Sequence, residues 1–386
     1  MTELKEVQTE RGTLRYYDEG SGPVVLFLHG SGPGVTGWRN FRGILPTFAA
    51  HFRCLILEFP GFGVSDDFGG HPMIDAQSAV VPFLDALGIE KVDIVGNSMG
   101  GGVGINFAIN NPDRIGKLVT IGGIGTNIFS PGPSEGIRLL QEFTEDPSRQ
   151  RLVDWLNSMV YDQSLVTEQL IEERWALATD PETLESARRM YGKKAFAQMM
   201  AFMRSADIPQ PWAQMHKVKA PTLLTWGRDD RVSPLDMALI PMRTISNAEL
   251  HVFPNCGHWA MIEAKEAFES TVLGFLLGVL PGGGAVIASF ASYAIEKKFS
   301  RTPERFGKGA IEGVAGPEAA NNAAAGGAFI PLMTLGIPPN VIMALLLGAF
   351  VVHGLQPGPL MITQNPEIFW GVVASMYIGN VMLLVL

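Results

Sequence analysis

Short apolar runs alternate with segments of helical pattern through residues 1–278. Each run has the length of a buried strand, and the alternation is typical of a mostly parallel sheet with helices on both faces. The predicted fold class is therefore α/β. The predicted strands are 13–18, 23–28, 53–58, 92–96, 118–122, 222–226 and 249–253, and the predicted helices are 38–50, 75–88, 99–111, 235–243 and 263–277.

Residues 126–206 interrupt this alternation. We interpret the segment as a helical lid inserted after a strand, so that residues 1–125 and 207–278 form the core. A lid in this position would cover a site and exclude water from it. The helical runs of the segment lie at 134–145, 147–159, 164–178 and 181–204.

The composition of the chain changes near residue 278. The stretches 270–295, 319–366 and 368–386 contain no Asp, Glu, Lys or Arg. A membrane-spanning helix needs about 20 mostly apolar residues, so these stretches predict an all-α, hydrophobic membrane-type tail over residues 279–386. Clusters of Gly and Pro within it are typical of the broken helices that line transport paths.

The segment Gly96-Asn97-Ser98-Met99-Gly100 joins a predicted strand to a predicted helix. A G-x-S-x-G turn in this context lifts a serine hydroxyl above the sheet. The flanking glycines are needed because side chains there would collide with the neighbouring strand and helix. Ser98 is therefore the candidate nucleophile, and it needs a neighbouring base because a serine hydroxyl alone is a poor nucleophile.

Two polar residues that follow later strands complete a catalytic triad. Asp230 and His258 each lie beyond the carboxyl end of a predicted strand, the edge of an open α/β sheet where catalytic groups gather. His258 would accept the proton of Ser98, and the acid would hold the imidazole in one tautomer. Asp230 is the candidate acid because it lies four residues after Trp226, and Asp229 is the alternative. The chain order Ser, Asp, His is that of the α/β hydrolases.

A glycine-rich loop, residues 29–34, follows the predicted strand 23–28. Such a loop can direct backbone N–H groups at a developing oxyanion. We assign the two donors to the N–H groups of Ser31 and Met99. His29 is an alternative base, and we interpret it instead as a structural residue that holds the loop.

Length, charge and cysteine content narrow the classes of function. The 386 residues allow two or three units, and the net charge of −9, without basic clusters in the first two-thirds, argues against nucleic acid as a partner. Cys54 and Cys256 fit neither a disulfide framework nor a zinc site, and no metal or other cofactor is predicted. The polar, charged amino-terminal segment does not resemble a secretory signal, which places the hydrolase part in the cytoplasm.

Residues 1–278 resemble the meta-cleavage product hydrolases, a family of α/β hydrolases. These enzymes cleave a carbon–carbon bond in 2-hydroxy-6-oxo-hexa-2,4-dienoates, the ring-fission products of aromatic degradation. The chain departs from the family at Glu58, at Val232 and over 260–263, near the expected distal pocket, which leaves the 6-substituent of the substrate open. The resemblance rests on segments 29–34, 37–38, 40–41, 60–63, 96–101, 161–165, 173–175, 226–231 and 257–259.

The resemblance implies further roles and a reaction. Arg174 would bind the substrate carboxylate and 2-oxo group as a planar bidentate donor; its alternative is a salt bridge with Glu172 or another nearby acid. Ketonisation of the dienol would precede attack or water addition at the 6-oxo group, and cleavage would release a 2-hydroxydienoate and a carboxylic acid. Dimers or higher oligomers are also implied. The implied substrate-binding residues are Gly32, Asn40, Asn97, Arg174 and Trp259.

The tail, residues 279–386, resembles the middle section of the large membrane subunit of tripartite tricarboxylate transporters. The resemblance rests on segments 281–284, 293–298, 302–309, 312–322 and 335–338. The expected location of this tail is the inner membrane. Short basic loops prefer the cytoplasmic side, so one span at 276–295 would place the hydrolase outside; a re-entrant hairpin or a tail that never inserts would avoid this conflict.

Three functions fit these patterns. The favoured one is a serine-type carbon–carbon hydrolase with a fused, non-transporting membrane fragment, because the enzyme part has every catalytic element and the tail is too short to form a translocation path. The second is a general serine esterase or thioesterase on the same scaffold. The third is a membrane transporter or anchor protein that carries the hydrolase as a passenger.

Overall fold

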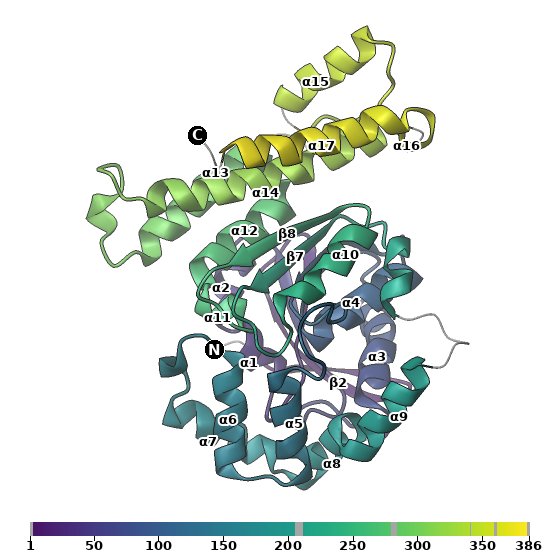
Figure 1. The fold of residues 1–386 in the computed structure, drawn as a ribbon, viewed down its shortest axis with the longest axis vertical. Coiled ribbons are helices and arrows are strands. Elements are labelled where there is room, and N and C mark those ends of the chain that lie inside the picture. Colours follow the sequence, from purple (N-terminus) through teal and green to yellow (C-terminus); the bar gives the residue numbers. More distant parts are fainter. Residues whose placement is uncertain (1–2, 205–210, 279–283, 340, 359–360, 384–386) are drawn as a thin grey trace. The chain divides into compact units, whose positions relative to one another are not determined.

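The computed structural model describes residues 3–204, 211–278, 284–339, 341–358 and 361–383 (Figure 1). The chain forms two compact units, Met1–Glu269 and Ser270–Leu386. The boundary between the two units, after Glu269, falls within helix α12, Lys265–Gly278. It therefore precedes the change in composition near residue 278. The first unit contains the sheet and the lid, and the described part of the second unit is helical.

An eight-stranded sheet forms the centre of the first unit, in the order β1-β2-β4-β3-β5-β6-β7-β8. The pairs β1–β2 and β2–β4 are antiparallel, and every pair from β4 to β8 is parallel, which confirms the predicted α/β class. The strands are β1 Lys5–Thr9, β2 Gly12–Glu19, β3 Val24–Leu28, β4 Arg53–Glu58, β5 Val92–Asn97, β6 Ile115–Ile121, β7 Thr222–Gly227 and β8 Ala248–Phe253.

Strand β1 was not predicted from the sequence. Its residues are almost all polar, and only Val7 and Thr9 are half-buried, because the strand lies at the edge of the sheet. An exposed edge strand has little apolar periodicity, so the hydrophobic pattern does not reveal it.

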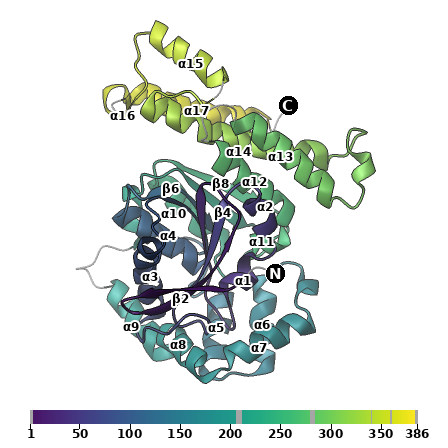
Figure 2. The same cartoon turned by 180° about the vertical axis from the view of Figure 1, so that it is seen from behind.

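The core helices lie on both sides of the sheet and are α1 Gly37–Phe41, α2 Leu45–Ala49, α3 Pro72–Ala86, α4 Met99–Asn110, α10 Leu239–Thr244, α11 Ala260–Glu263 and α12 (Figures 1 and 2). The helix predicted over 38–50 is in fact two helices, α1 and α2. Pro46 stands in the first turn of α2, where proline starts a helix rather than continuing one.

Five helices form the lid expected over residues 126–206. They gather at one end of the first unit (Figures 1 and 2). The helix predicted over 181–204 is divided at Gly192, whose N–H donates to the carbonyl oxygen of Arg188 at the end of α8. The lid helices are α5 Glu135–Glu145, α6 Arg149–Met159, α7 Glu168–Ala178, α8 Pro181–Tyr191 and α9 Lys193–Arg204.

Helix α4 packs closely on the central strands through glycine. A Cβ atom at Gly100 would lie 2.0 Å from the carbonyl oxygen of Leu28 in β3, and one at Gly96 would lie 2.3 Å from the carbonyl oxygen of Gly100. Backbone atoms cannot move aside for a side chain, so the prediction that glycines must flank Ser98 is confirmed.

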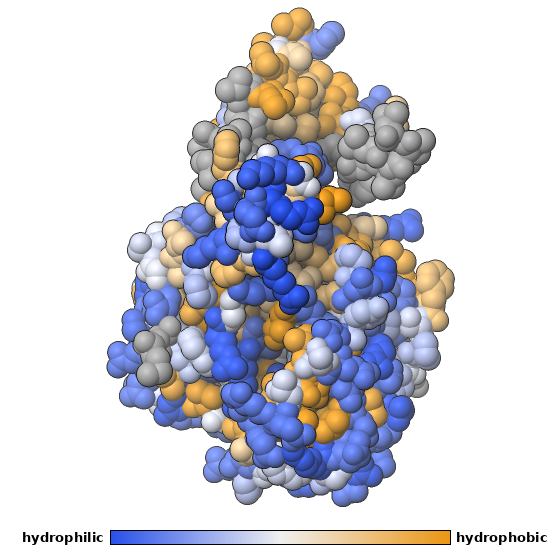
Figure 3. Space-filling model, turned by 90° about the vertical axis from the view of Figure 1, so that its left-hand side faces the viewer, coloured by the Kyte–Doolittle hydropathy of each residue, from blue (hydrophilic) through white to orange (hydrophobic). Residues whose placement is uncertain are grey.

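Small side chains pack the first two helices of the second unit. Helices α13, Gly284–Phe299, and α14, Glu312–Leu335, meet at Ala288, Ala320 and Ala324. Helices α15 Val341–Val352, α16 Met361–Gln364 and α17 Pro366–Leu383 join α14 in a second apolar cluster. Hydrophobic surface remains exposed on this unit (Figure 3), and its most exposed large side chains include Phe290, Ile311, Ile342, Leu345 and Val352.

The spanning helices expected of the tail are not found. Within the ranges that the structure describes, none of the helices is both long and apolar enough to cross a bilayer. Helix α15 has 12 residues and is therefore ~18 Å long, against ~30 Å of hydrocarbon. The 24-residue α14 is built largely of Gly, Ala and Asn and contains Glu312 and Glu318. The described helices therefore do not bear out this expectation, which counted apolar residues across Gly and Pro positions such as Gly336 at the end of α14.

Gly100→Ala is expected to destabilise the protein by about 1–3 kcal/mol, because the new methyl group overlaps the Leu28 carbonyl. Gly102→Ala in the same helix is the matched control, since the nearest atom to its Cβ would be Met73 Cε at 3.9 Å. Alanine favours the helix by about 1 kcal/mol over glycine, so this variant should be more stable. Urea unfolding measures both free energies, and equal values would contradict the packing argument.

Candidate active site

Ser98 occupies the turn between β5 and α4 in a left-handed backbone conformation, with φ 52° and ψ −113°. Its N–H donates to the carbonyl oxygen of Ile121 in β6 at 2.9 Å, and its carbonyl oxygen accepts from the N–H of Gly102 at 3.2 Å. A serine rarely adopts this conformation, which costs about 1–3 kcal/mol and is concentrated at functional sites. The strand–turn–helix context predicted for the G-x-S-x-G segment is therefore present.

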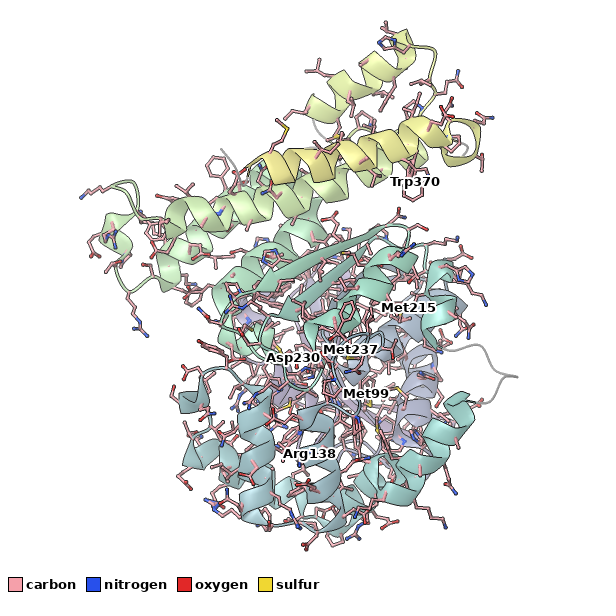
Figure 4. All side chains as sticks on the ribbon, viewed as in Figure 1. Met99, Arg138, Met215, Asp230, Met237 and Trp370 are labelled. Carbon is pink, nitrogen blue, oxygen red and sulfur yellow. The ribbon has the colours of Figure 1, made fainter. Side chains whose placement is uncertain are left out.

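Asp230 and His258 form a buried pair. Asp230 Oδ2 lies 2.7 Å from His258 Nδ1, and both side chains are almost fully buried. Asp230 Oδ1 accepts from the N–H groups of Val232 and Ser233, each at 2.8 Å. These bonds fix the carboxylate while its second oxygen orients the imidazole. Figure 4 shows Asp230 and Met99 between the strands and the lid helices.

Asp229, the alternative acid, takes a different position. Its carboxylate lies 3.3 Å from Arg228 Nη2 and is about a third exposed, at 32%. Its N–H donates to the carbonyl oxygen of Cys256. Of the two neighbouring aspartates, the structure therefore places Asp230 beside the imidazole.

A turn of two glycines connects Ser98 to the Asp230–His258 pair. A Cβ atom at Gly123 would lie 2.2 Å from Ser98 Cα, and one at Gly122 would lie 3.3 Å from both Asp230 Oδ2 and His258 Cε1. The nucleophile and the pair thus flank the same turn after β6. These glycines were not among the residues predicted from the sequence, although a Gly-Gly pair after a predicted strand is a turn signal.

The glycine-rich loop lies directly against the nucleophile. A Cβ atom at Gly30 would lie 2.8 Å from Asn97 Oδ1 and 3.3 Å from Ser98 Cβ. The N–H of Gly30 donates to Asn40 Oδ1 at 3.0 Å, which fixes the loop. Asn40 Nδ2 is buried and has no hydrogen-bond partner among the described residues. Asn40 therefore holds the loop with one end of its amide and leaves a donor free with the other.

The two predicted oxyanion donors lie on different elements, Met99 at the start of α4 and Ser31 in the glycine-rich loop after β3. Met99 is the first residue of α4, so its N–H has no partner inside the helix. The Ser31 hydroxyl shares a short hydrogen bond with the hydroxyl of Tyr191 in the lid helix α8. Burial raises the pKa of Tyr191 to about 12, so it remains a phenol. Nothing in the sequence pattern singled out Tyr191.

His29 is a structural residue. Its Nδ1 lies 2.7 Å from the carbonyl oxygen of Gly30, and its Nε2 accepts from the N–H of Phe59 at 2.9 Å. Both ring nitrogens are thus engaged by the backbone, and burial lowers the pKa of His29 to about 4. A neutral ring with both nitrogens occupied holds the loop and cannot serve Ser98 as a base.

Glu58 likewise supports the scaffold. Its carboxylate accepts from the N–H groups of Gly37 at 2.7 Å and Trp38 at 2.9 Å, at the start of α1. Burial raises its pKa to about 7. This departure from the family therefore caps the start of helix α1.

Arg174 projects from the lid helix α7 and is buried, at 2% exposed. Its Nη1 donates to the carbonyl oxygen of Pro33 at 3.2 Å, and its guanidinium carbon lies 5.1 Å from the centre of the Trp259 ring. Among the described residues its Nε has no hydrogen-bond partner. Glu172, the alternative partner, instead pairs with Arg149 at 2.8 Å. Burial lowers the pKa of Arg174 to about 9, so the group is a cation at neutral pH.

The remaining predicted substrate-binding residues surround the same region. Asn97 Nδ2 donates to the carbonyl oxygen of Ile121 at 3.1 Å. The rings of Trp259 and Trp155 meet edge to face, 6.5 Å apart, and a Cβ atom at Gly32 would lie 2.6 Å from the Trp155 ring. Trp155 is a second aromatic residue of the site that the sequence analysis missed, because an apolar residue on a lid helix carries no motif.

This geometry brings Ser98, the Asp230–His258 pair and the glycine-rich loop to one edge of the sheet, and the guanidinium of Arg174 donates to that loop at Pro33. Across the described ranges of the chain, no cluster of three or more His, Cys, Asp or Glu residues could hold a metal ion. The arrangement can activate a hydroxyl group, stabilise an oxyanion and bind an anionic substrate.

Known proteins similar to this chain show the family of its first unit. Residues 23–265 match the family model described as the alpha/beta hydrolase fold, and residues 236–386 match that of the tripartite tricarboxylate transporter TctA family. A 2-hydroxy-6-oxo-6-phenylhexa-2,4-dienoate hydrolase of Burkholderia cepacia is 40% identical over 299 residues, covering 72% of this chain and 99% of the relative. A 2-hydroxy-6-oxononadienedioate/2-hydroxy-6-oxononatrienedioate hydrolase of Comamonas testosteroni is 41% identical, with the same coverage.

Solved structures give the same result. A meta-cleavage product hydrolase from Pseudomonas fluorescens is 31% identical with a TM-score of 0.62, covering 69% of this chain and 95% of that one. The 2-hydroxy-6-oxo-6-phenylhexa-2,4-dienoate hydrolase from a Rhodococcus strain is 29% identical with a TM-score of 0.62, covering 71% and 98%. The chain therefore belongs, through its first unit, to the α/β hydrolases of the meta-cleavage product hydrolase family.

Proposed function

We propose that this protein hydrolyses a carbon–carbon bond in a 2-hydroxy-6-oxo-hexa-2,4-dienoate, a product of aromatic ring fission. The net reaction adds one water molecule and releases a 2-hydroxydienoate and a carboxylic acid. The observation that carries this proposal is the buried guanidinium of Arg174, which lies beside the ring of Trp259. Trp259 directly follows the base His258 in the sequence. Among the described residues the Nε of Arg174 has no hydrogen-bond partner, and a substrate carboxylate would supply one where a neutral ester would not.

The catalytic step rests on Ser98, His258 and Asp230. His258 takes a proton from the attacking hydroxyl group as the 6-oxo carbon is attacked, and Asp230 stabilises the imidazolium that forms. The oxyanion on the former 6-oxo group would accept hydrogen bonds from the N–H groups of Met99 and Ser31. Ketonisation of the dienol precedes this step, because the leaving carbon can then depart as a stabilised enolate.

Arg174 would select the substrate by charge. Removing a guanidinium from water is costly unless the charge is paired, so a substrate carboxylate in this position would offset that cost. A bidentate contact would also fix the direction of the dienoate relative to Ser98. Asn40 Nδ2, buried and unpartnered among the described residues, is a second donor suited to the same oxygen atoms.

The proposed activity is tested with dienoates against p-nitrophenyl esters. Loss of the conjugated absorbance and release of a carboxylic acid are expected for the dienoates, with far higher kcat/KM than for the esters. Ser98→Ala should abolish turnover because the nucleophilic oxygen is removed. Equal turnover by that variant would remove Ser98 from the mechanism, and rapid ester hydrolysis without dienoate cleavage would indicate a general esterase.

Asp230→Asn is expected to lower kcat by about 10³-fold or more, because the amide no longer favours the imidazolium and its correct tautomer. Asp229→Asn is the matched control and should retain nearly full activity, since its carboxylate faces Arg228. Steady-state kinetics with the dienoate measures both variants. A larger loss in Asp229→Asn than in Asp230→Asn would reverse the assignment.

Arg174→Gln is expected to raise KM for the dienoate about tenfold to a hundredfold, the range for losing hydrogen bonds to a charged group. Neutral p-nitrophenyl esters should be affected much less, because they have no carboxylate to bind. Arg149→Gln, an exposed arginine nearby in the lid, is the control. Similar losses on both substrate classes would reject the role of Arg174 in binding the carboxylate.

A further inference from the structure

The carboxylate of Glu263, at the end of α11, connects two separate segments of the first unit. Its Oε1 accepts from the N–H groups of Tyr161 at 2.7 Å and Asp162 at 3.0 Å, in the lid segment that follows α6. Its Oε2 accepts from the N–H of Gly257 at 2.6 Å. Gly257 directly precedes the base His258, so this one side chain links the lid to the catalytic histidine loop.

Further contacts hold His258 at the same junction. The N–H of His258 donates to the carbonyl oxygen of Met159, the last residue of α6, at 2.7 Å. A Cβ atom at Gly257 would lie 2.6 Å from that oxygen and 3.0 Å from Glu263 Oε2. The N–H groups of both Gly257 and His258 are therefore hydrogen-bonded, the first to Glu263 Oε2 and the second to the carbonyl oxygen of Met159.

We propose that Glu263 is a positioning residue for His258: it fixes the backbone of the catalytic loop against the end of α6 and so sets the place of the imidazole between Asp230 and Ser98. The inference rests on the proposed function, in which His258 is the base. Placement of the base matters because a displacement of 1 Å in a catalytic group can cost about 10²-fold in rate.

A second carboxylate, that of Asp236, allows the positioning role to be distinguished experimentally from simple attachment of the lid. Asp236 Oδ2 accepts from the N–H groups of Ile128, Phe129 and Ser130 at 2.7–3.1 Å, where the chain enters the lid. Asp236 therefore makes the same kind of contact with lid backbone as Glu263, but its hydrogen bonds lie away from the histidine loop. If attachment of the lid were all that mattered, removing either carboxylate would have the same kinetic effect.

The test compares Glu263→Gln, Asp236→Asn and Glu266→Gln in the full chain. In Glu263→Gln the side chain keeps its size, but its NH₂ group faces a backbone N–H and cannot accept from it. Glu266 is exposed on α12 and is the control for loss of a charge nearby. We expect Glu263→Gln to lower kcat about tenfold to a hundredfold with KM within about twofold, because the dienoate contacts are untouched.

The pH profile gives the second readout. A displaced imidazole loses part of its bond to Asp230, so the acidic limb of kcat against pH should move to lower pH in Glu263→Gln alone. Phosphonylation of Ser98 by a fluorophosphonate, measured on the folded fraction, should slow in parallel. If Glu263→Gln does not fold, Glu263→Asp replaces it, since the shorter side chain cannot reach both segments.

The outcomes are distinct. Loss of kcat with a moved pH profile in the Glu263 variant, and an unmoved profile in Asp236→Asn and Glu266→Gln, supports the proposal. Unchanged kcat and profile in a folded Glu263 variant overturn it, and so do equal changes in the Glu263 and Asp236 variants. Failure of the proposed function would be seen separately, in a wild-type protein that does not cleave dienoates, while the phosphonylation rate would still report on His258.

Discussion

The left-handed backbone of Ser98 is the constraint on which the rest of the site depends. This conformation is costly for a residue with a side chain, so the surrounding structure must hold it. Glycines from three separate elements allow the chain to pack closely around it: a Cβ atom would lie 3.3 Å from Ser98 Cβ at Gly30, 2.0 Å from the Leu28 carbonyl oxygen at Gly100 and 2.2 Å from Ser98 Cα at Gly123. The close approach places the loop, the nucleophile and the Asp230–His258 pair within one small volume.

Carboxylates bonded to backbone N–H groups hold the loops around this turn. Asp230 accepts from the turn that follows it, Glu58 from the start of α1, Asp236 from the entry to the lid, and Glu263 from both the lid and the histidine loop. Charge-assisted bonds of this kind are stronger than neutral ones, and they order irregular backbone where a sheet or helix cannot. Arg174 differs from them, because it is a buried cation whose Nη1 donates to the carbonyl oxygen of Pro33 and whose Nε has no hydrogen-bond partner among the described residues.

The two units follow different packing principles. The sheet of the first unit is buried by large side chains, whereas α13 and α14 approach through Ala288, Ala320 and Ala324. Small side chains allow these two helix backbones to approach closely, whereas α14 to α17 meet through larger apolar side chains such as Leu332 and Phe350. The second unit falls within the region that matches the TctA family model, and that match begins inside the hydrolase unit, at residue 236.

The sequence by itself indicated the alternation of strands and helices, the helical insertion after a strand, and the turns that carry Ser98 and His258. Local sequence patterns indicate these features: apolar runs of strand length, the turn around Ser98 and the segment around His258. The sequence did not reveal the polar edge strand β1 or the division of residues 38–50 into two helices, because neither feature has a clear hydrophobic periodicity.

Only the tertiary structure distinguished between residues of the same type, such as the neighbouring Asp229 and Asp230. In the structure Asp230 rather than Asp229 contacts the imidazole, Glu172 pairs with Arg149, and Glu263 accepts from the backbone of the lid. The tertiary structure also divided the apolar tail into helices too short or too polar to span a bilayer within its described residues. Each of these outcomes depends on contacts between segments far apart in the chain or on where helices end, and no local sequence pattern encodes the direction in which a side chain meets a distant partner.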